Sequence, residues 1–216
     1  MTSFSTAAQD AKARAEQSST RIAFFIAGFS VASWAPLVPY VKQRMGLDEG
    51  TLGLLLLCLG VGSIISMPLA GALAARFGCR RLLVCSTLLI CLCLPLLATI
   101  SSLPLLIATL FLFGASMGGV DCTANVQAVI VERASGKTMM SGFHGLFSLG
   151  GIVGAAGVAR PLRPGILPFC SVLVLGGVAL APPAEAGPKL FSLGSPAGGP
   201  AFSVSRGVGV FFCLLW

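Results

Sequence analysis

The amino-acid sequence predicts an all-α membrane protein with five to six transmembrane helices. The chain of 216 residues is 56% hydrophobic, and only 10% of its residues are charged. A soluble domain carries about 25% charged residues, so this chain could not cover a water-facing surface. Five apolar runs each supply the roughly 20 residues that a helix needs to cross a bilayer.

The first predicted span covers about residues 21–41 and follows a polar segment at residues 1–20. We expect that segment to be a disordered cytoplasmic tail. Pro36 and Pro39 should bend or end the span. The span also resembles the apolar part of a secretory signal, but the apolar runs that follow favour an uncleaved helix. Trp34 is expected to anchor the span at the membrane interface.

Four further spans are predicted from the remaining apolar runs. They cover about residues 51–74, 82–100, 105–131 and 138–159. Small residues recur within them, which lets helix backbones approach closely in lipid. In the last of these spans, the Gly-x-x-x-Gly pattern of Gly150 and Gly154 predicts a close helix contact.

Two of the loops between these spans are basic. Arg76, Arg80 and Arg81 surround a glycine turn after the second span, while Arg133 and Lys137 lie before the fifth. The other two loops carry no net charge. Because short loops rich in Lys and Arg stay in the cytoplasm, we expect the basic loops and the N-terminus on the cytoplasmic side of the inner membrane.

The chain changes character after residue 159. Residues 160–216 hold eight of the thirteen prolines. Residues 160–182 contain a candidate sixth span that is short for a crossing, and residues 183–216 read as an irregular, disordered tail. The abrupt change suggests either a coding frame lost near Arg160 or a degenerate terminus.

Three polar residues within the spans are candidates for a substrate or proton pathway. Asp121 lies well inside the fourth span, where a carboxylate is costly and by default functional. Asn125 follows it by four residues, on the same helical face. His144 is the one histidine of the chain, and its titration range suits proton coupling. The alternative is that these groups only hold the bundle together through hydrogen bonds.

The loop at residues 71–81 resembles a signature of the major facilitator superfamily, Gly-x-x-x-Asp-Arg-x-Gly-Arg-Arg/Lys. Ala75 stands where that family usually has Asp, and Cys79 where it often has Arg. The residues that match the signature are Gly71, Arg76, Gly78 and Arg80.

A second resemblance is more specific and points to the MosC-like, rhizopine-transporter-like branch of that family. The segments that carry it are residues 121–128, 131–133 and 141–151. The resemblance covers about residues 20–159 and is expected to stop there.

Membership would imply one half of a twelve-helix bundle, completed by a second half or by another copy of the chain. The resemblance implies transport of a small polar, sugar-like solute between the halves, driven by an ion gradient, and protons are the expected ion. It also implies a cytoplasmic gate formed by the basic loops. The gate residues would be Gly71, Arg76, Gly78, Arg80, Arg81, Glu132 and Arg133, with Glu132 and Arg133 either pairing with the arginines or acting only as solvated anchors.

Other function classes find no support in the sequence. No nucleophile with a base, no paired carboxylates and no nucleotide loop indicate an enzyme, and we expect no cofactor. The cysteines form no Cys-x-x-Cys pair, so no metal site is expected. The basic residues mark membrane orientation, not nucleic-acid binding. The rival to transport is an inactive, frameshifted membrane fragment.

Overall fold

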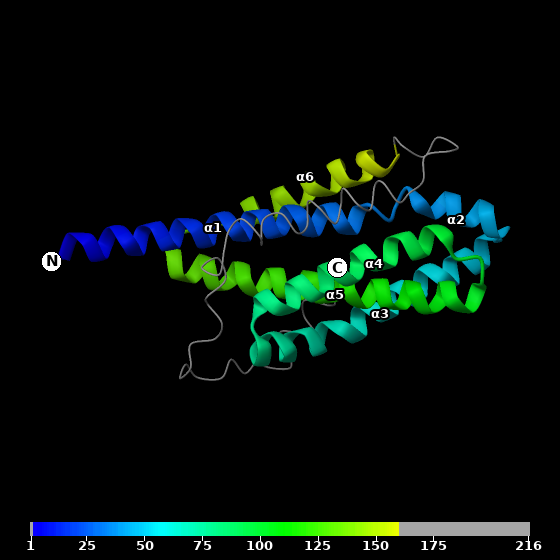
Figure 1. Cartoon of the computed structure of the whole chain (residues 1–216), viewed down its shortest axis with the longest axis horizontal. Helices are drawn as coiled ribbons and strands as arrows, with labels where there is room; N and C mark the ends of the chain where they lie inside the picture. The colour runs from blue at the N-terminus through cyan, green and yellow to red at the C-terminus, as the bar shows by residue number, and fades with distance from the viewer. Residues whose placement is uncertain (1, 160–216) are drawn as a thin grey trace.

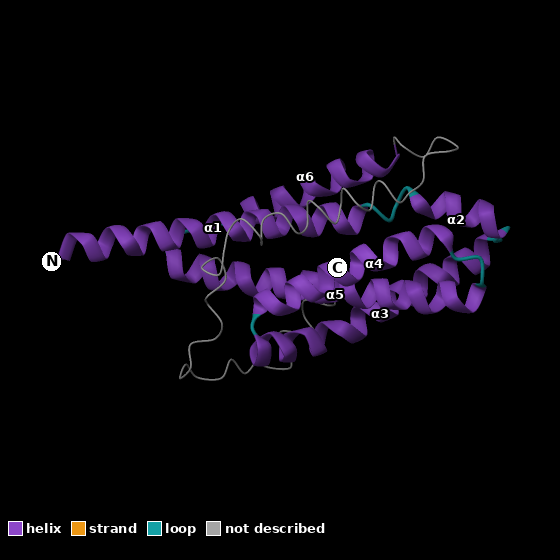
Figure 2. Ribbon diagram, viewed as in Figure 1, coloured by secondary structure: helices purple, strands orange, loops and turns teal. Residues whose placement is uncertain are grey.

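The computed structural model describes residues 2–159, and within them it contains six α-helices and no strand (Figures 1 and 2). The helices are α1 (Thr2–Ala32), α2 (Leu37–Met45), α3 (Glu49–Phe77), α4 (Cys79–Thr99), α5 (Leu103–Ser135) and α6 (Met140–Ala159). The predicted all-α membrane class is confirmed. The candidate sixth span and the tail expected after it lie outside the described residues.

Helix α5 lies at the centre of the bundle. It packs against α3 and α4, and it also contacts α1 and α6. Helix α6 packs mainly against α1. The α3–α4 and α5–α6 connections lie at the same end of the bundle as the N-terminus (Figure 1). The two basic loops and the N-terminal segment therefore share one end.

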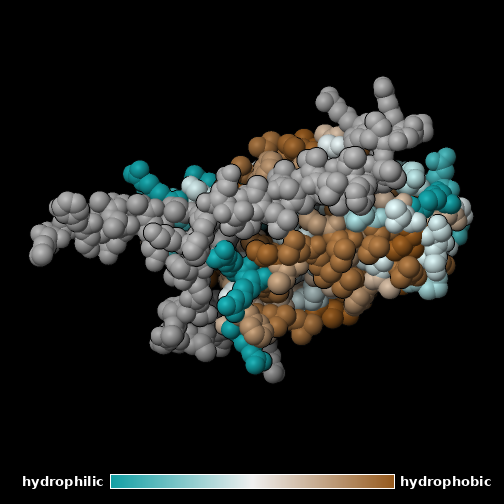
Figure 3. Space-filling view, viewed as in Figure 1, coloured by the Kyte–Doolittle hydropathy of each residue, from teal (hydrophilic) through white to brown (hydrophobic). Residues whose placement is uncertain are grey.

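Five segments of the described chain are long and apolar enough to cross a membrane. They are Glu16–Met45, Glu49–Phe77, Cys79–Thr99, Leu103–Ser135 and Met140–Ala159. Each overlaps one of the five ranges expected from the sequence. Large apolar side chains such as Leu57 and Ile64 are exposed, and apolar surface dominates the middle of the face in Figure 3, with hydrophilic groups toward its ends. Such a surface suits lipid contact.

The first span is a broken helix. Helix α1 ends at Ala32, the chain turns, and α2 begins at Leu37 after Pro36. The Ser33 hydroxyl donates a hydrogen bond to the Phe29 carbonyl oxygen at 2.7 Å. Pro39 lies in the first turn of α2, where its missing N–H is not needed. The predicted bend is therefore present.

The expected disordered tail at residues 1–20 differs from the structure, in which α1 is helical from Thr2. Alanine, glutamine, glutamate, lysine and arginine are good helix formers, and they make up much of this segment. Once the apolar part of α1 has formed, adding residues to its end avoids the unfavourable nucleation step. Polarity alone was therefore a poor guide to disorder here.

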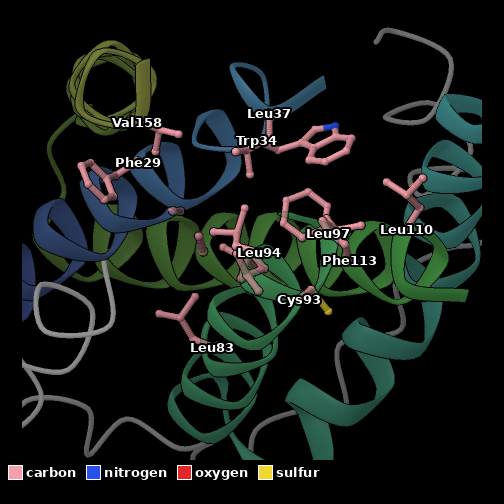
Figure 4. Packing of buried hydrophobic residues seen from close by; sticks show 14 of the residues in the cluster. Phe29, Trp34, Leu37, Leu83, Cys93, Leu94, Leu97, Leu110, Phe113 and Val158 are labelled. Atoms are coloured by element: carbon pink, nitrogen blue, oxygen red, sulfur yellow. The ribbon is translucent and has the colours of Figure 1, made fainter. Parts of the chain in front are cut away.

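Trp34 is a core residue, contrary to the interface role expected from the sequence. Its side chain is only 8% exposed, and its ring centroid lies 6.0 Å from that of Phe113 on α5. Figure 4 shows both rings beside Leu97 of α4. The turn after Ala32 directs Trp34 toward the bundle interior, and the sequence gives no direct sign of that turn's path.

Close helix contacts depend on glycine, as the Gly-x-x-x-Gly pattern predicted. A Cβ atom added to Gly150 would collide with the Phe25 carbonyl oxygen, and one added to Gly154 with that of Phe29. Helices α1 and α6 therefore touch backbone to backbone. Gly114 of α5 meets the Leu59 carbonyl of α3 in the same way. Dispersion between closely packed backbones stabilises such contacts in lipid.

Arg44 attaches α2 to the end of α4. Its Nη2 atom donates hydrogen bonds to the carbonyl oxygens of Leu97, at 3.1 Å, and of Ile100. Carbonyls at a helix C-terminus lack partners within their own helix, so a cation is favoured there. The loop that contains Arg44 was expected to matter only for its net charge.

Candidate functional site

Asp121 and Asn125 form a polar pair near the middle of α5. The Asn125 Nδ2 atom donates hydrogen bonds to the Asp121 carbonyl oxygen at 2.9 Å and to its Oδ1 atom at 3.2 Å. Thr123, Ala124 and neighbouring side chains of α5 are buried in the bundle, whereas Asp121 is exposed. The carboxylate therefore lies on a surface of the described bundle and not in its core.

His144 lies in the second turn of α6. Its Nδ1 atom is 3.1 Å from the Met140 carbonyl oxygen, and its ring centroid is 5.4 Å from that of Phe24 on α1. An electrostatic interaction links His144 to Asp121 of α5. Asp121 and Asn125 are thus joined by a hydrogen bond within α5, and His144 of α6 interacts electrostatically with Asp121.

Gly78 forms the tight turn between α3 and α4. Its φ of 86° and ψ of 147° are unfavourable for residues with a side chain. Its N–H donates a hydrogen bond to the Ala74 carbonyl oxygen at 2.9 Å and so closes the last turn of α3. Two helices can therefore be joined by a single residue at this end.

The remaining signature residues surround that turn. Gly71 lies within α3, with open space where a side chain would be. The Arg76 guanidinium lies 5.3 Å from the centroid of the Phe77 ring. Arg80 and Arg81 lie in the first turn of α4. The arginines thus gather at one end of the bundle, as expected for a basic loop.

Glu132 has a role that the sequence analysis missed. Its Oε2 atom accepts hydrogen bonds from the backbone N–H groups of Met139 and Met140, both at 2.7 Å. It therefore caps α6 from the end of α5, where a negative charge meets the positive end of the helix dipole. The sequence signal that could have identified this cap is a carboxylate a few residues before the start of a helix. Pairing of Glu132 with the arginines stays a prediction, and Arg133 is exposed beside it.

Within residues 2–159, no group of three or more His, Cys, Asp and Glu side chains could hold a metal ion. Asp121, Asn125 and His144 stay the candidates expected from the sequence. A carboxylate and an amide can accept and donate hydrogen bonds to a polar solute, and an imidazole can exchange a proton near neutral pH.

Comparison with known proteins identifies relatives. The profile of the Major Facilitator Superfamily matches residues 21–180. An uncharacterized MFS-type transporter of Yersinia pestis is 47% identical over 201 residues, which cover 93% of this chain and 52% of that protein. Membrane protein MosC of Rhizobium meliloti is 34% identical over 131 residues, covering 61% of this chain and 32% of that protein. No solved structure matches the chain.

These matches correct one expectation. The resemblance does not stop at residue 159, because the family match continues to residue 180 and the Yersinia alignment includes 201 of the 216 residues. The loss of a coding frame near Arg160 was suggested by the change in composition there, and it stays a prediction. The chain spans about half the length of the Yersinia relative and about a third of that of MosC. With a family match over most of its length and five apolar helices of spanning length, the chain belongs to the Major Facilitator Superfamily and is a multi-pass membrane protein.

Proposed function

We propose that the chain forms one half of a secondary transporter that moves a small polar, sugar-like solute, driven by a proton gradient. The observation that carries the proposal is the polar pair of Asp121 and Asn125 near the middle of the long apolar helix α5, with which His144 of α6 interacts. Ionisable residues are expensive at that depth and usually mark a substrate or ion pathway.

The exposure of Asp121 supports a binding role over a purely structural one. A group that only fastened helices together would lie between them, as buried Thr123 does. Asp121 is exposed instead, with its Oδ1 oriented by Asn125. In the complete protein that surface would face the second half, and solutes of such transporters bind near the membrane midplane between repeats.

The length of the relatives supports the need for a second half. The chain covers 52% of the Yersinia protein, whose name describes it as an MFS-type transporter. Alternating access requires two units that rock against each other. We propose that a second six-helix half, or another copy of this chain, completes the transporter.

We further propose that the N-terminus and the α3–α4 and α5–α6 connections lie in the cytoplasm, with the protein in the inner membrane. Arg76, Arg80, Arg81 and Arg133 all belong to that end of the bundle. Basic residues concentrate on the cytoplasmic side. In this arrangement the basic loops would form the cytoplasmic gate.

Uptake by a completed protein tests the proposal. The chain would be joined to the part of the Yersinia relative that it does not cover, and purified into liposomes. We expect the fusion to take up at least one member of a panel of labelled sugars and inositols when a proton gradient is applied. Uptake by the chain without the added half would mean that another copy of the chain completes the transporter. Asp121→Asn should abolish uptake, whereas Asp48→Asn, a matched change outside the spans, should not.

Two results would count against the proposal. Uptake that is unchanged by Asp121→Asn would remove this carboxylate from the pathway. A correctly inserted fusion that transports no member of the panel would favour the rival interpretation, in which the chain is an inactive membrane fragment.

A further inference from the structure

One ring nitrogen of His144 is held by the backbone. Nδ1 lies 3.1 Å from the Met140 carbonyl oxygen. A carbonyl oxygen can only accept a hydrogen bond, so Nδ1 must carry a proton in this arrangement. The neutral imidazole then has its lone pair on Nε2. Nε2 is therefore the atom of His144 that can take up another proton.

Met140 is held from its other side by Glu132. The Glu132 Oε2 atom accepts hydrogen bonds from the N–H groups of Met139 and Met140 at 2.7 Å. Met140 is the first residue of α6, and its N–H has no partner within the helix. Glu132 and His144 thus bind the two polar groups of the same residue, the N–H and the carbonyl.

We propose that Glu132 is a positioning residue for His144. Glu132 fixes the first turn of α6 and so keeps the Met140 carbonyl oxygen within hydrogen-bonding distance of His144 Nδ1. That carbonyl selects the Nδ1–H tautomer, which leaves Nε2 free for proton exchange. The groups that face His144 from the neighbouring helices are Asp121 of α5 and the Phe24 ring of α1. The role of Nε2 in transport rests on the proposed function, whereas the link from Glu132 to the tautomer does not.

The tautomer can be measured without any transport assay, because His144 is the one histidine of the chain. The full chain would be labelled with nitrogen-15 histidine and reconstituted in lipid nanodiscs. Nitrogen NMR of the neutral ring should show a protonated Nδ1 and an unprotonated Nε2. In Glu132→Ala the Nδ1–H population should fall at least severalfold, toward the Nε2–H form that free histidine prefers.

Two variants sharpen the test. Glu132→Gln keeps a weaker acceptor, so a smaller but measurable Nε2–H population is expected. Glu49→Ala removes an exposed glutamate that pairs with Lys42 at the other end of the bundle, and it should leave the spectrum unchanged.

The proposal is overturned if wild-type His144 is in the Nε2–H form, or if a folded Glu132→Ala protein keeps the wild-type tautomer. If Glu132→Ala fails to insert, Glu132→Gln decides, and an unchanged tautomer there also overturns the proposal. Failure of the proposed function looks different, because the fusion would then transport nothing while the nitrogen spectra still respond to Glu132.

Discussion

The side-chain amide of Asn125 binds both the backbone carbonyl and the carboxylate of Asp121, one helical turn earlier on α5. One amide nitrogen thereby reduces the freedom of the carboxylate. Both hydrogen bonds of the pair use the Asn125 Nδ2 atom, so the Oδ1 atom of the same side chain can accept a hydrogen bond from a solute. The pair thus combines an oriented carboxyl group with a neutral acceptor.

Asn125→Ala should therefore weaken transport without abolishing it. A hydrogen bond to a charged group contributes about 1.5–3 kcal/mol, and about 1.4 kcal/mol corresponds to a tenfold change. We expect kcat/KM for uptake by the completed protein to fall by about tenfold or more. Initial uptake rates over a range of solute concentrations measure this. Thr99→Ala, which removes an exposed hydroxyl bonded to the Pro95 carbonyl, is the control. Equal kinetics for both variants would show that Asn125 does not orient the carboxylate.

The sequence predicted those features that depend on spacing along one helix. The four-residue spacing placed Asp121 and Asn125 on one face, and the Gly-x-x-x-Gly pattern identified Gly150 and Gly154 as contact residues. Both follow from the helical period alone. The glycine turn at Gly78 was likewise visible, because glycine tolerates the backbone angles that end a helix abruptly.

Features that depend on the path of the chain between helices were not predicted. The cap that Glu132 places on α6 requires the chain to reverse between residues 135 and 140. Trp34 is buried because the turn after α1 directs it onto Phe113. Neither relationship has a fixed spacing in the sequence. Trp34 was therefore expected at the membrane interface, and Glu132 was expected either to pair with the arginines of the gate or to act as a solvated anchor.

Gly150→Ala should destabilise the contact between α1 and α6. The added Cβ would collide with the backbone oxygen of Phe25, which cannot move without shifting its helix. Overpacking of this kind costs about 1–3 kcal/mol. The free energy of unfolding in mixed micelles would measure the loss.

Gly145→Ala is the matched control on the same helix, because nothing lies near its added Cβ. Alanine is favoured over glycine within a helix by about 0.5–1 kcal/mol, so this variant should be as stable as the wild type or slightly more so. Equal losses in the two variants would contradict the close backbone contact at Gly150.

Gly78→Ala should strain the turn between α3 and α4. A φ of 86° with a ψ of 147° lies in a region that is essentially restricted to glycine, and placing a side chain there costs about 1–3 kcal/mol. The same unfolding measurement applies. Gly71→Ala is the control, because Gly71 lies within α3 and has open space around it. A Gly78→Ala protein as stable as Gly71→Ala would show that this turn does not need a positive φ.

Asp48, which lies outside the spans at the start of α3, should make stability depend on pH in the acid range. The Thr51 hydroxyl donates to Asp48 Oδ2 at 2.6 Å and the Thr51 N–H donates to Oδ1 at 3.0 Å. These hydrogen bonds lower the pKa of Asp48 below its ordinary 3.8. Because these hydrogen bonds favour the ionised carboxylate, ionised Asp48 stabilises the folded state. This stabilisation is fully present above the pKa that Asp48 has in the unfolded chain, and it is lost as the pH falls through the lower pKa that Asp48 has in the folded protein.

Replacing Asp48 should remove that acid dependence. Asparagine can still cap α3 but does not titrate. Below about pH 4, the free energy of unfolding of Asp48→Asn should therefore change less with pH than that of the wild type, because the contribution of this carboxylate is missing. Thr51→Val keeps the carboxylate and removes the hydroxyl that contributes most to the lowered pKa, so it should reduce the slope only in part. Acid unfolding curves of the three proteins, followed by circular dichroism, make the comparison. If stability depended on acid pH in the same way in all three proteins, the folded and unfolded states would bind the Asp48 proton equally well.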